Sequence, residues 1–320
     1  GQVVITDDLT IRGPGAAKLS IHGDGDRVFA VVPARYAAET DLFTKPTPEQ
    51  LAAAPEVEIQ KLTIAKGTAA NAPGLSLDSG FSFGGGIYNL GSTVHLDRVR
   101  MTANTAVGAV TAGGAVGNEF GGTLTVSRSH FDQNASAGAV IAVGGAITSD
   151  LGGTDDGTEE GGVTQPPVVA VDRSSFVGNT AQAQLLGYLG GPFTGIGGGG
   201  AILNVTGAMT ITRSHFDGNA AIGGPGGPDA ISGGAGFGGA ILSGDVSPFG
   251  AAESSLVVSK STFVANTATG GSSAAADVPG GIAAGGAISV GNGSDAKLKH
   301  NTFDSNAAIG GAGGLDANGG

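Results

Sequence analysis

Short bursts of alternating apolar and polar residues recur along the whole chain and predict β-strands rather than helices. The clearest bursts precede a recurring Phe, and the position five residues before that Phe is always apolar. This position holds Leu96, Val126, Val171, Ile211, Val258 and Leu298. Because successive side chains of a strand point to opposite faces, the pattern is typical of a strand with one buried face. The Phe has the opposite parity, so we expect a corner between the strand and the Phe.

Two sequence markers alternate along the chain and define an internal repeat. The first marker is Phe-x-x-Asn, found at Phe131/Asn134, Phe176/Asn179, Phe216/Asn219, Phe263/Asn266 and Phe303/Asn306, with Met101/Asn104 as a degenerate copy. The second is Gly-Gly-Ala-Ile or a close variant, which starts at Gly84, Gly113, Gly144, Gly199, Gly238 and Gly285. Successive starts lie 29, 31, 55, 39 and 47 residues apart. The repeat therefore tolerates insertions of variable length.

A unit of about 30 residues with short strands, a corner and a Gly-rich return is typical of one coil of a parallel β-solenoid, whose coils pair ~4.8 Å apart. Equivalent residues then form ladders. The Phe ladder is predicted to fill the interior. The Asn residues are expected to adopt the left-handed conformation at the next bend and to bond the amides of adjacent coils. The corner is placed at Ser127-Arg128 and its equivalents, and is followed by a stack of Ser129, Ser174, Ser214 and Ser261.

The first part of the chain carries the same alternation without the markers, for example in Val3-Val4-Ile5 and Leu9-Thr10-Ile11. These bursts add two or three coils to the six that carry the markers. The sequence therefore predicts a single all-β solenoid domain over residues 1–320, with eight or nine coils. Insertions are expected near residues 33–56, 151–167 and 182–198. In the first insertion, Thr47 and Gln50 form a capping box around Pro48, which predicts one short helix through Ala54.

Composition narrows the fold class and the range of partners. The 62 Gly and 13 Pro among 320 residues exclude a helical bundle, yet 40% of the chain is apolar, which a disordered Gly-rich polymer would not be. The net charge of -12 argues against nucleic acid and anionic membranes as partners, and no apolar run is continuous enough to cross a bilayer. The absence of Cys removes disulfides and thiolate chemistry.

The pairing of Gly-Gly-Ala-Ile with Phe-x-x-Asn resembles the repeat of polymorphic outer-membrane proteins. Their surface-exposed passengers are right-handed parallel β-helices of the pectate-lyase type. The segment from Asp8 to Ala16 is also similar to the opening coil of many secreted bacterial β-helix proteins. The resemblance implies a right-handed helix and an extracellular or cell-surface location. The start at Gly1, without Met or a signal sequence, fits a mature secreted chain and equally a trimmed one.

A column of basic residues three positions before the Phe is the main candidate binding site. It consists of Arg98, Arg128, Arg173, Arg213 and Lys260, followed by His300. One interpretation is a track that binds acidic polysaccharide. The other, which we favour, is a set of exposed corner residues that pair with neighbouring acids, namely Asp97, Asp132, Asp172, Asp217 and Asp304.

No metal or cofactor is assigned. His130 and His215 each precede a Phe but are expected to be solvated corner residues, because non-ligand residues such as Ser175 lie between them. The acidic loop that contains Asp155, Asp156, Glu159 and Glu160 is a calcium candidate, and so is the Gly-rich run 224–229. Solvated negative charge is the alternative that we favour.

The leading functional hypothesis is a non-enzymatic structural protein that associates head to tail into a filament. A solenoid needs covered ends, whereas here Val3 opens a strand directly and the last repeat stops soon after Ile309. The apolar residues Leu185, Leu186, Tyr188, Leu189 and Phe193 are candidates for self-contact. Alternatives are a surface adhesin that binds glycans through the basic column and a polysaccharide lyase or hydrolase. The lyase is disfavoured because no coil carries a convergent set of acids and bases.

Overall fold

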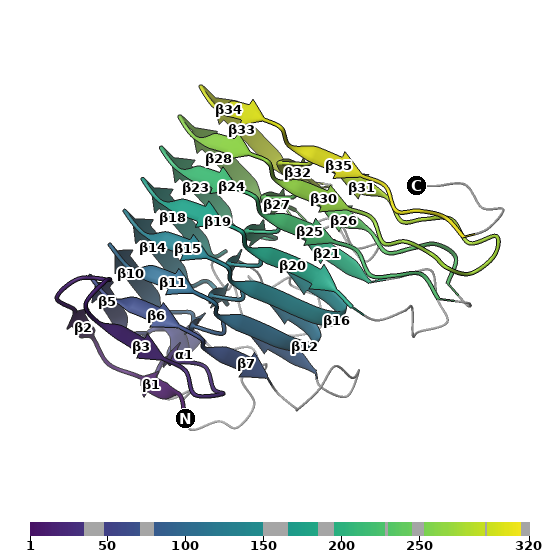
Figure 1. Ribbon diagram of the computed structural model, residues 1–320. Helices are drawn as coiled ribbons and strands as arrows, with labels where there is room; N and C mark the ends of the chain where they lie inside the picture. Colours follow the sequence, from purple (N-terminus) through teal and green to yellow (C-terminus); the bar gives the residue numbers. More distant parts are fainter. Residues whose placement is uncertain are drawn as a thin grey trace.

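The computed structural model describes residues 1–34, 48–70, 80–149, 166–184, 195–227, 230–244, 253–291 and 293–314. These residues form a parallel β-solenoid, which confirms the predicted fold class (Figure 1). The strands nearest the viewer in Figure 1 run to the right while the chain climbs from the N-terminus at the bottom to the C-terminus at the top, so the winding is right-handed. Four sheets, A to D, run along the solenoid axis.

Sheets A, B and C each contain eight strands, one from each coil. Sheet A comprises β1 (Val3–Ile5), β4 (Phe29–Val31), β9 (Ile87–Leu90), β13 (Val116–Glu119), β17 (Ile147–Ser149), β22 (Ile202–Asn204), β27 (Ile241–Ser243) and β32 (Ile288–Val290). Sheet B comprises β2 (Leu9–Arg12), β5 (Glu56–Gln60), β10 (Thr93–Asp97), β14 (Thr123–Ser127), β18 (Val168–Asp172), β23 (Ala208–Thr212), β28 (Ser255–Ser259) and β33 (Asp295–Lys299). Sheet C comprises β3 (Ser20–His22), β6 (Thr63–Ala65), β11 (Arg100–Thr102), β15 (His130–Asp132), β19 (Ser175–Val177), β24 (His215–Asp217), β29 (Thr262–Val264) and β34 (Thr302–Asp304).

Sheet D closes every coil after the first and carries the greatest variation in length. It comprises β7 (Thr68–Ala70), β8 (Phe81–Phe83), β12 (Thr105–Ala112), β16 (Ala135–Val143), β20 (Thr180–Ala183), β21 (Ile196–Gly198), β25 (Ala220–Ile222), β26 (Gly236–Phe237), β30 (Thr267–Thr269), β31 (Ala283–Ala284) and β35 (Ala307–Ile309). In coils with an insertion, two short strands replace one long strand such as β16, which pairs with both β20 and β21. The one described helix, α1 (Pro48–Leu51), begins where the capping box predicts but ends before Ala54.

The interior is apolar and is built from several parallel columns of side chains, of which the Phe ladder is one. The predicted Phe ladder is present: Phe131, Phe176, Phe216 and Phe263 are fully buried, and successive ring centroids lie 4.8 Å apart. Phe303 continues the stack at 5.0 Å. Each fully buried Phe contributes about 1.5–3 kcal/mol relative to an exposed one, so the ladder is a major source of stability.

Residues with a positive φ form the corners on both sides of sheet C. The predicted corner lies between sheets B and C, where Arg128 has a φ of 48° and its equivalents in other coils are similar. The second corner follows the Phe, and here the prediction was wrong in detail. The left-handed residue is the one before the Asn, such as Gln133 with a φ of 54°, and not the Asn itself.

This correction applies to every predicted member of the Asn ladder, because none of them has a positive φ. The members are Asn104, Asn134, Asn179, Asn219, Asn266 and Asn306. The residue that bends in place of each Asn is, in the same order, Ala103, Gln133, Gly178, Gly218, Ala265 and Ser305. The Asn therefore lies one position beyond the bend in all six coils.

The ladder itself is present as predicted, and its hydrogen bonds explain why the Asn is not the bend residue. The side-chain Nδ2 of one Asn donates to the Oδ1 of the next, for example from Asn134 to Asn179 at 2.9 Å. The same Oδ1 accepts the Asn134 main-chain N–H at 3.1 Å, and Asn134 Nδ2 also donates to the Met101 carbonyl at 3.0 Å. These bonds require a side chain that points inward, because a buried amide without partners would be costly.

The same bond between side chains runs through all six coils. Asn104 donates to Asn134 at 3.0 Å, Asn179 to Asn219 at 2.9 Å, Asn219 to Asn266 at 2.8 Å and Asn266 to Asn306 at 2.8 Å. Asn104, Asn219 and Asn266 are fully buried, whereas Asn306 in the last coil is half-buried. Asn306 Nδ2 still donates to the Phe263 carbonyl, at 2.9 Å. The ladder thus extends to the last described coil.

The Ser stack is a second ladder beside the Phe. Ser174 Oγ accepts the Ser129 main-chain N–H at 3.1 Å and donates to the Asp172 carbonyl at 2.9 Å. Ser214 and Ser261 repeat the contact in the following coils. The hydroxyl thus forms hydrogen bonds with main-chain groups that, because of the corner, have no partner on a neighbouring strand.

Candidate functional site

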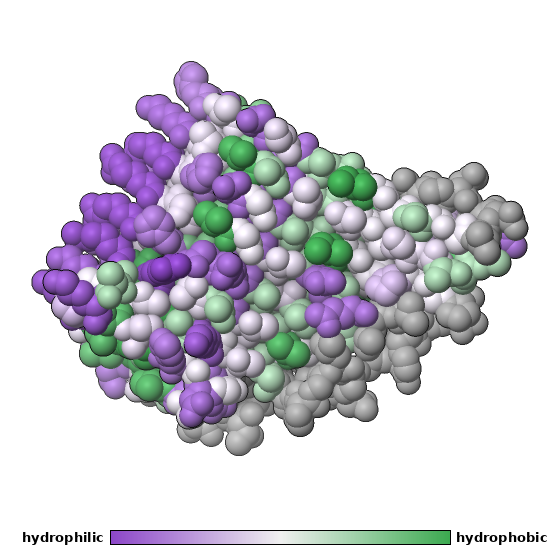
Figure 2. Space-filling model, in the orientation of Figure 1, coloured by the Kyte–Doolittle hydropathy of each residue, from purple (hydrophilic) through white to green (hydrophobic). Residues whose placement is uncertain are grey.

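The basic column runs along the corner between sheets B and C. Its members all have a φ between 47° and 54°: Lys61, Arg98, Arg128, Arg173, Arg213, Lys260 and His300. The side chains of the four arginines remain between 45% and 58% exposed. Strand register aligns the corners of successive coils, so the main-chain positions of the column are spaced about 4.8 Å apart along the axis. Figure 2 shows strongly hydrophilic residues along the left edge of the molecule, where sheet B meets sheet C.

Two carboxylates are each shared by two arginines of this column. Asp97 Oδ2 accepts from Arg98 Nη2 at 2.7 Å, and Asp97 Oδ1 accepts from Arg128 Nε of the next coil at 2.9 Å. Ser127 Oγ also donates to Asp97 Oδ1, at 2.7 Å.

Asp172 repeats the arrangement further along the column. Its carboxylate lies 3.1 Å from Arg173 Nη1 and 2.5 Å from Arg213 Nη2. Thr212 takes the role of Ser127 and donates to Asp172 Oδ1 at 2.6 Å. Two clusters, each of one acid and two arginines, therefore lie side by side on the corner.

The pKa of both shared carboxyls is lowered from the ordinary Asp value. Desolvation of Asp97 acts to raise its pKa, but hydrogen bonds from Ser127, Arg128 and Arg98 outweigh it. In Asp172 the desolvation is outweighed in the same way by Thr212 and Arg213. Both groups therefore stay ionised to a lower pH than a free Asp would.

Positive charge is strongly concentrated at this corner. In register with Asp97 on sheet B lie Arg12 in the first coil and Lys299 in the last. The corner column and this neighbouring column together hold eight of the 15 Lys and Arg residues of the chain, against two acids, Asp97 and Asp172. The edge thus has a local excess of six positive charges on a protein whose net charge is -12.

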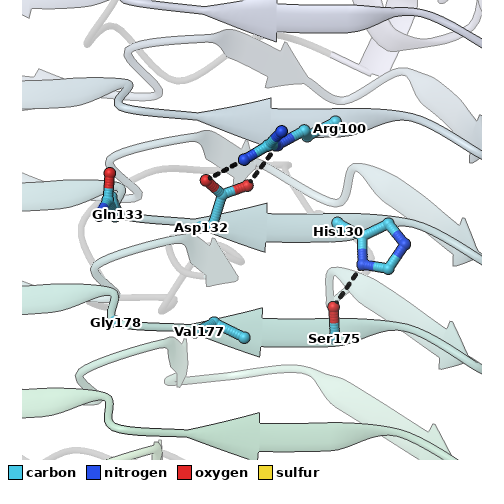
Figure 3. A pocket seen from close by; sticks show the side chains of 7 residues that line it. All are labelled: Arg100, His130, Asp132, Gln133, Ser175, Val177 and Gly178. Atoms are coloured by element: carbon cyan, nitrogen blue, oxygen red, sulfur yellow. Dashed lines mark hydrogen bonds and ion pairs between the residues drawn. The ribbon is translucent and has the colours of Figure 1, made fainter. Parts of the chain in front are cut away.

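A shallow polar groove lies on the outer face of sheet C, next to the corner (Figure 3). Arg100 Nε and Nη2 donate to the two carboxylate oxygens of Asp132 on the next strand, at 2.8 and 2.9 Å. His130 Nδ1 is 2.6 Å from Ser175 Oγ of the following strand. The groove is also lined by Gln133, Val177 and Gly178. Asp132 therefore pairs with Arg100 within sheet C, and not with a member of the basic column.

The remaining predicted site residues give no metal centre. Within the described ranges, no three His, Asp or Glu side chains gather as metal ligands. His130 and His215 lie on strands β15 and β24, which β19 separates. The calcium candidates Asp155, Asp156, Glu159 and Glu160 lie outside the described residues, as do the last two positions of the run 224–229. None of the helices in the described ranges is long and apolar enough to span a membrane.

Apolar residues are exposed on the first and the last coil. In the last coil Leu298 and Phe303 are each 47% exposed, although their equivalents in the middle coils are buried. In the first coil Val3 is 53% and Leu9 is 42% exposed. The candidate self-contact residues Leu185, Leu186, Tyr188, Leu189 and Phe193 lie outside the described residues.

Two features of the described residues were missing from the sequence prediction. Lys61 is a further member of the basic column, and the alternation of Leu62-Thr63-Ile64 could have aligned it. A column of buried polar residues ends the strands of sheet A, and two pairs within it are bonded: Asn89 Nδ2 donates to Asn118 Oδ1 at 2.7 Å and Asn204 Nδ2 to Ser243 Oγ at 3.3 Å. Its signal is a polar residue two positions after the marker Ile, as in Ile202-Leu203-Asn204.

Comparison of the chain with protein-family models, with curated proteins and with solved structures finds no match. The similarity to polymorphic outer-membrane proteins therefore stays a prediction from the repeat motifs. Function has to be argued from the surfaces of the solenoid itself.

Proposed function

We propose that the protein is a non-enzymatic structural component of the cell surface or extracellular space, and that copies stack end to end. The solenoid is built for rigidity, since each coil is bonded to the next through buried Phe, Ser and Asn ladders. The ladders repeat regularly from coil to coil, as is typical of a rod-like structural protein. The extracellular location rests on the resemblance of the repeat motifs.

The observation that carries the proposal is the match between the two end coils. Strand register places Ile21 of β3 in the same column as Phe303 of β34. It likewise places Val3 of β1 in the column of Ile288 in β32. A second copy shifted along the axis would therefore continue the interior columns and cover apolar side chains that are now exposed. It would also pair β32 and β33, which are edge strands among the described residues, with β1 and β2.

The same register places like charges across the proposed contact. Arg12 of β2 and Lys299 of β33 occupy one column of sheet B, so they would face each other between copies. Like charges directly opposite each other on paired strands are destabilising. We therefore expect association of the natural sequence to be weak at low ionic strength and to be limited by this pair.

Lys299→Glu tests the proposed contact, because it replaces a repulsion by an ion pair with Arg12 of the neighbouring copy. We expect the variant to form longer end-to-end assemblies than the natural protein at the same concentration in about 50 mM salt, where charges are screened little. Sedimentation velocity and negative-stain microscopy measure the effect. Lys66→Glu is the matched control, since it makes the same charge change on an exposed residue at the other corner of sheet C. Monomers for both the natural protein and Lys299→Glu would exclude stacking in this register.

A further inference from the structure

We infer that the basic column between sheets B and C is a binding site for a linear acidic polysaccharide, which lies parallel to the solenoid axis. This site is separate from the end faces on which the proposed function rests. The carboxylate or sulfate groups of the polymer would contact guanidinium and ammonium groups of successive coils. The inference rests on the backbone conformation of the column, its charge balance and the charges that flank it.

The backbone of the corner does not require a basic residue. A φ near 50° is strained for any residue except Gly and, to a lesser extent, Asn. The other corner of sheet C has the same φ, and there the chain uses Lys66 in one coil and Ala103, Gln133, Gly178, Gly218, Ala265 and Ser305 in the six that follow. At the basic column, by contrast, the residue is Lys, Arg or His in seven coils. The cations are therefore placed at strained positions where a smaller residue would suit the fold as well or better.

Neighbouring acids balance the charge of the column only in part, although they pair with all four of its arginines. Asp97 and Asp172 are each shared by two arginines, and within the described ranges no ion pair involves Lys61 or Lys260. Cations on successive coils, whose main-chain positions are about 4.8 Å apart, repel one another, and salt screens this only in part at separations below the Debye length. Repulsion between the cations and the strained main chain both lower the stability of the fold. Features that destabilise a fold in this way are typical of functional surfaces.

The narrow shape of the basic column favours one class of polyanion. The column is one side chain wide and from Lys61 to His300 extends over six coil steps, or about 29 Å at the ordinary strand spacing. On the sheet B side it is flanked by Glu56 and Glu58, with Lys297 in the same column as Glu58. On the sheet C side it is flanked by Asp217 and by Asp132, which is paired with Arg100. A membrane or a nucleic-acid duplex is broad and would also meet the acids Glu56, Glu58 and Asp217, whereas a single thin chain can follow the row of corner cations.

Single-stranded nucleic acid is a poor match for a different reason. Proteins that bind it without sequence preference rely on exposed aromatic side chains on which the bases stack. The two columns of the corner contain no Phe, Tyr or Trp in the described coils, and the Phe side chains of sheet C from Phe131 to Phe263 are buried in the core. A polyanion without bases, such as a polyuronate or a sulfated glycan, needs only the cations that are present.

Arg128→Gly combined with Arg213→Gly removes one cation from each shared cluster and relaxes the backbone at both positions. The other arginine of each pair still bonds Asp97 or Asp172. We expect the variant to remain folded, because relief of backbone strain offsets the lost bonds to Asp97 and Asp172. It should bind immobilised heparin and polygalacturonate at least tenfold more weakly, and its affinity should depend less on salt concentration. Lys18→Ala with Lys66→Gly is the control, because it removes two exposed cations outside the column, one of them also at a positive φ.

The affinities are measured by biolayer interferometry at several salt concentrations, with dextran, single-stranded DNA and phosphatidylserine vesicles as further probes. The inference is supported if the natural protein and the control variant bind the acidic glycans and the column variant does not. Absence of binding to both glycans, equal losses in the variant and the control, or tighter binding to DNA or vesicles would overturn it.

Discussion

Asp97 joins two coils at the basic corner, and its ionisation determines how much this contact contributes. The pKa of Asp97 is lowered in the folded state, although desolvation acts to raise it, because Ser127, Arg128 and Arg98 bond the ionised form. The contribution is therefore fully present above the pKa of the unfolded chain, about 3.9, and is lost as the pH falls through the folded pKa. We expect Asp97→Asn to lower the unfolding temperature at pH 7 and to have a smaller effect at pH 3, which is below the pKa of the unfolded chain.

The control at this scale is Asp295→Asn, which makes the same charge change on the exposed strand β33. Calorimetric melts of both variants and the natural protein between pH 2 and pH 7 measure the difference. A loss for Asp97→Asn that is the same at pH 3 and pH 7 would contradict the assignment, since it would show that the ionised carboxylate is not the stabilising form.

Glycines allow the coils to stack closely. Substitutions at two of them distinguish the cost of a steric clash between coils from the cost of a strained main-chain conformation. A Cβ at Gly145 would collide with the Gly200 carbonyl oxygen of the next coil. At Gly178, which has a φ of 60°, an added Cβ meets no atom within 4 Å. Ala103 and Ala265 already occupy that column with a φ of 52°, so the site accepts a side chain at the cost of some strain.

We therefore expect Gly178→Ala to lower the free energy of unfolding by about 1 kcal/mol, the cost of a left-handed Ala. Gly145→Ala should lower it by about 3 kcal/mol, since the coils have to move apart around a rigid backbone contact. Urea denaturation of the two variants measures both values. Equal losses would mean that close approach is not what the Gly-Gly marker provides.

At the scale of the whole molecule, the two proposed surfaces respond to salt in opposite directions. End-to-end association brings Arg12 of one copy against Lys299 of another, so screening should strengthen it. Binding of an acidic polysaccharide to the basic column is an attraction between opposite charges, so screening should weaken it. Raising NaCl from about 50 to about 300 mM is expected to increase the average mass of the assemblies that the natural protein forms and to reduce its retention on heparin.

Light scattering measures the mass and affinity chromatography measures the retention, on one preparation. If both quantities changed in the same direction, one of the two proposed surfaces would be wrong.

The repeat in the sequence was enough to predict the fold, because a solenoid places equivalent residues of successive coils over one another. The Phe ladder, the Ser ladder and the corner at Ser127-Arg128 all follow from aligning the copies. The alignment did not predict which residue bends after the Phe. Asn tolerates the left-handed conformation, but the tertiary structure gives that role to Gln133 and its equivalents, because the buried Asn134 amide is bonded to both neighbouring coils.

The sequence alone thus determined the architecture and the interior of this protein, since both depend on which residue types recur with the period of the coil. Only the tertiary structure decided how the surface charges combine. Asp97 and Arg128 lie 31 residues apart in the chain, and insertions of different length make such a separation uninformative about contact. Strand register brings them together, and it also shows that one narrow edge holds an excess of cations while the protein as a whole is acidic.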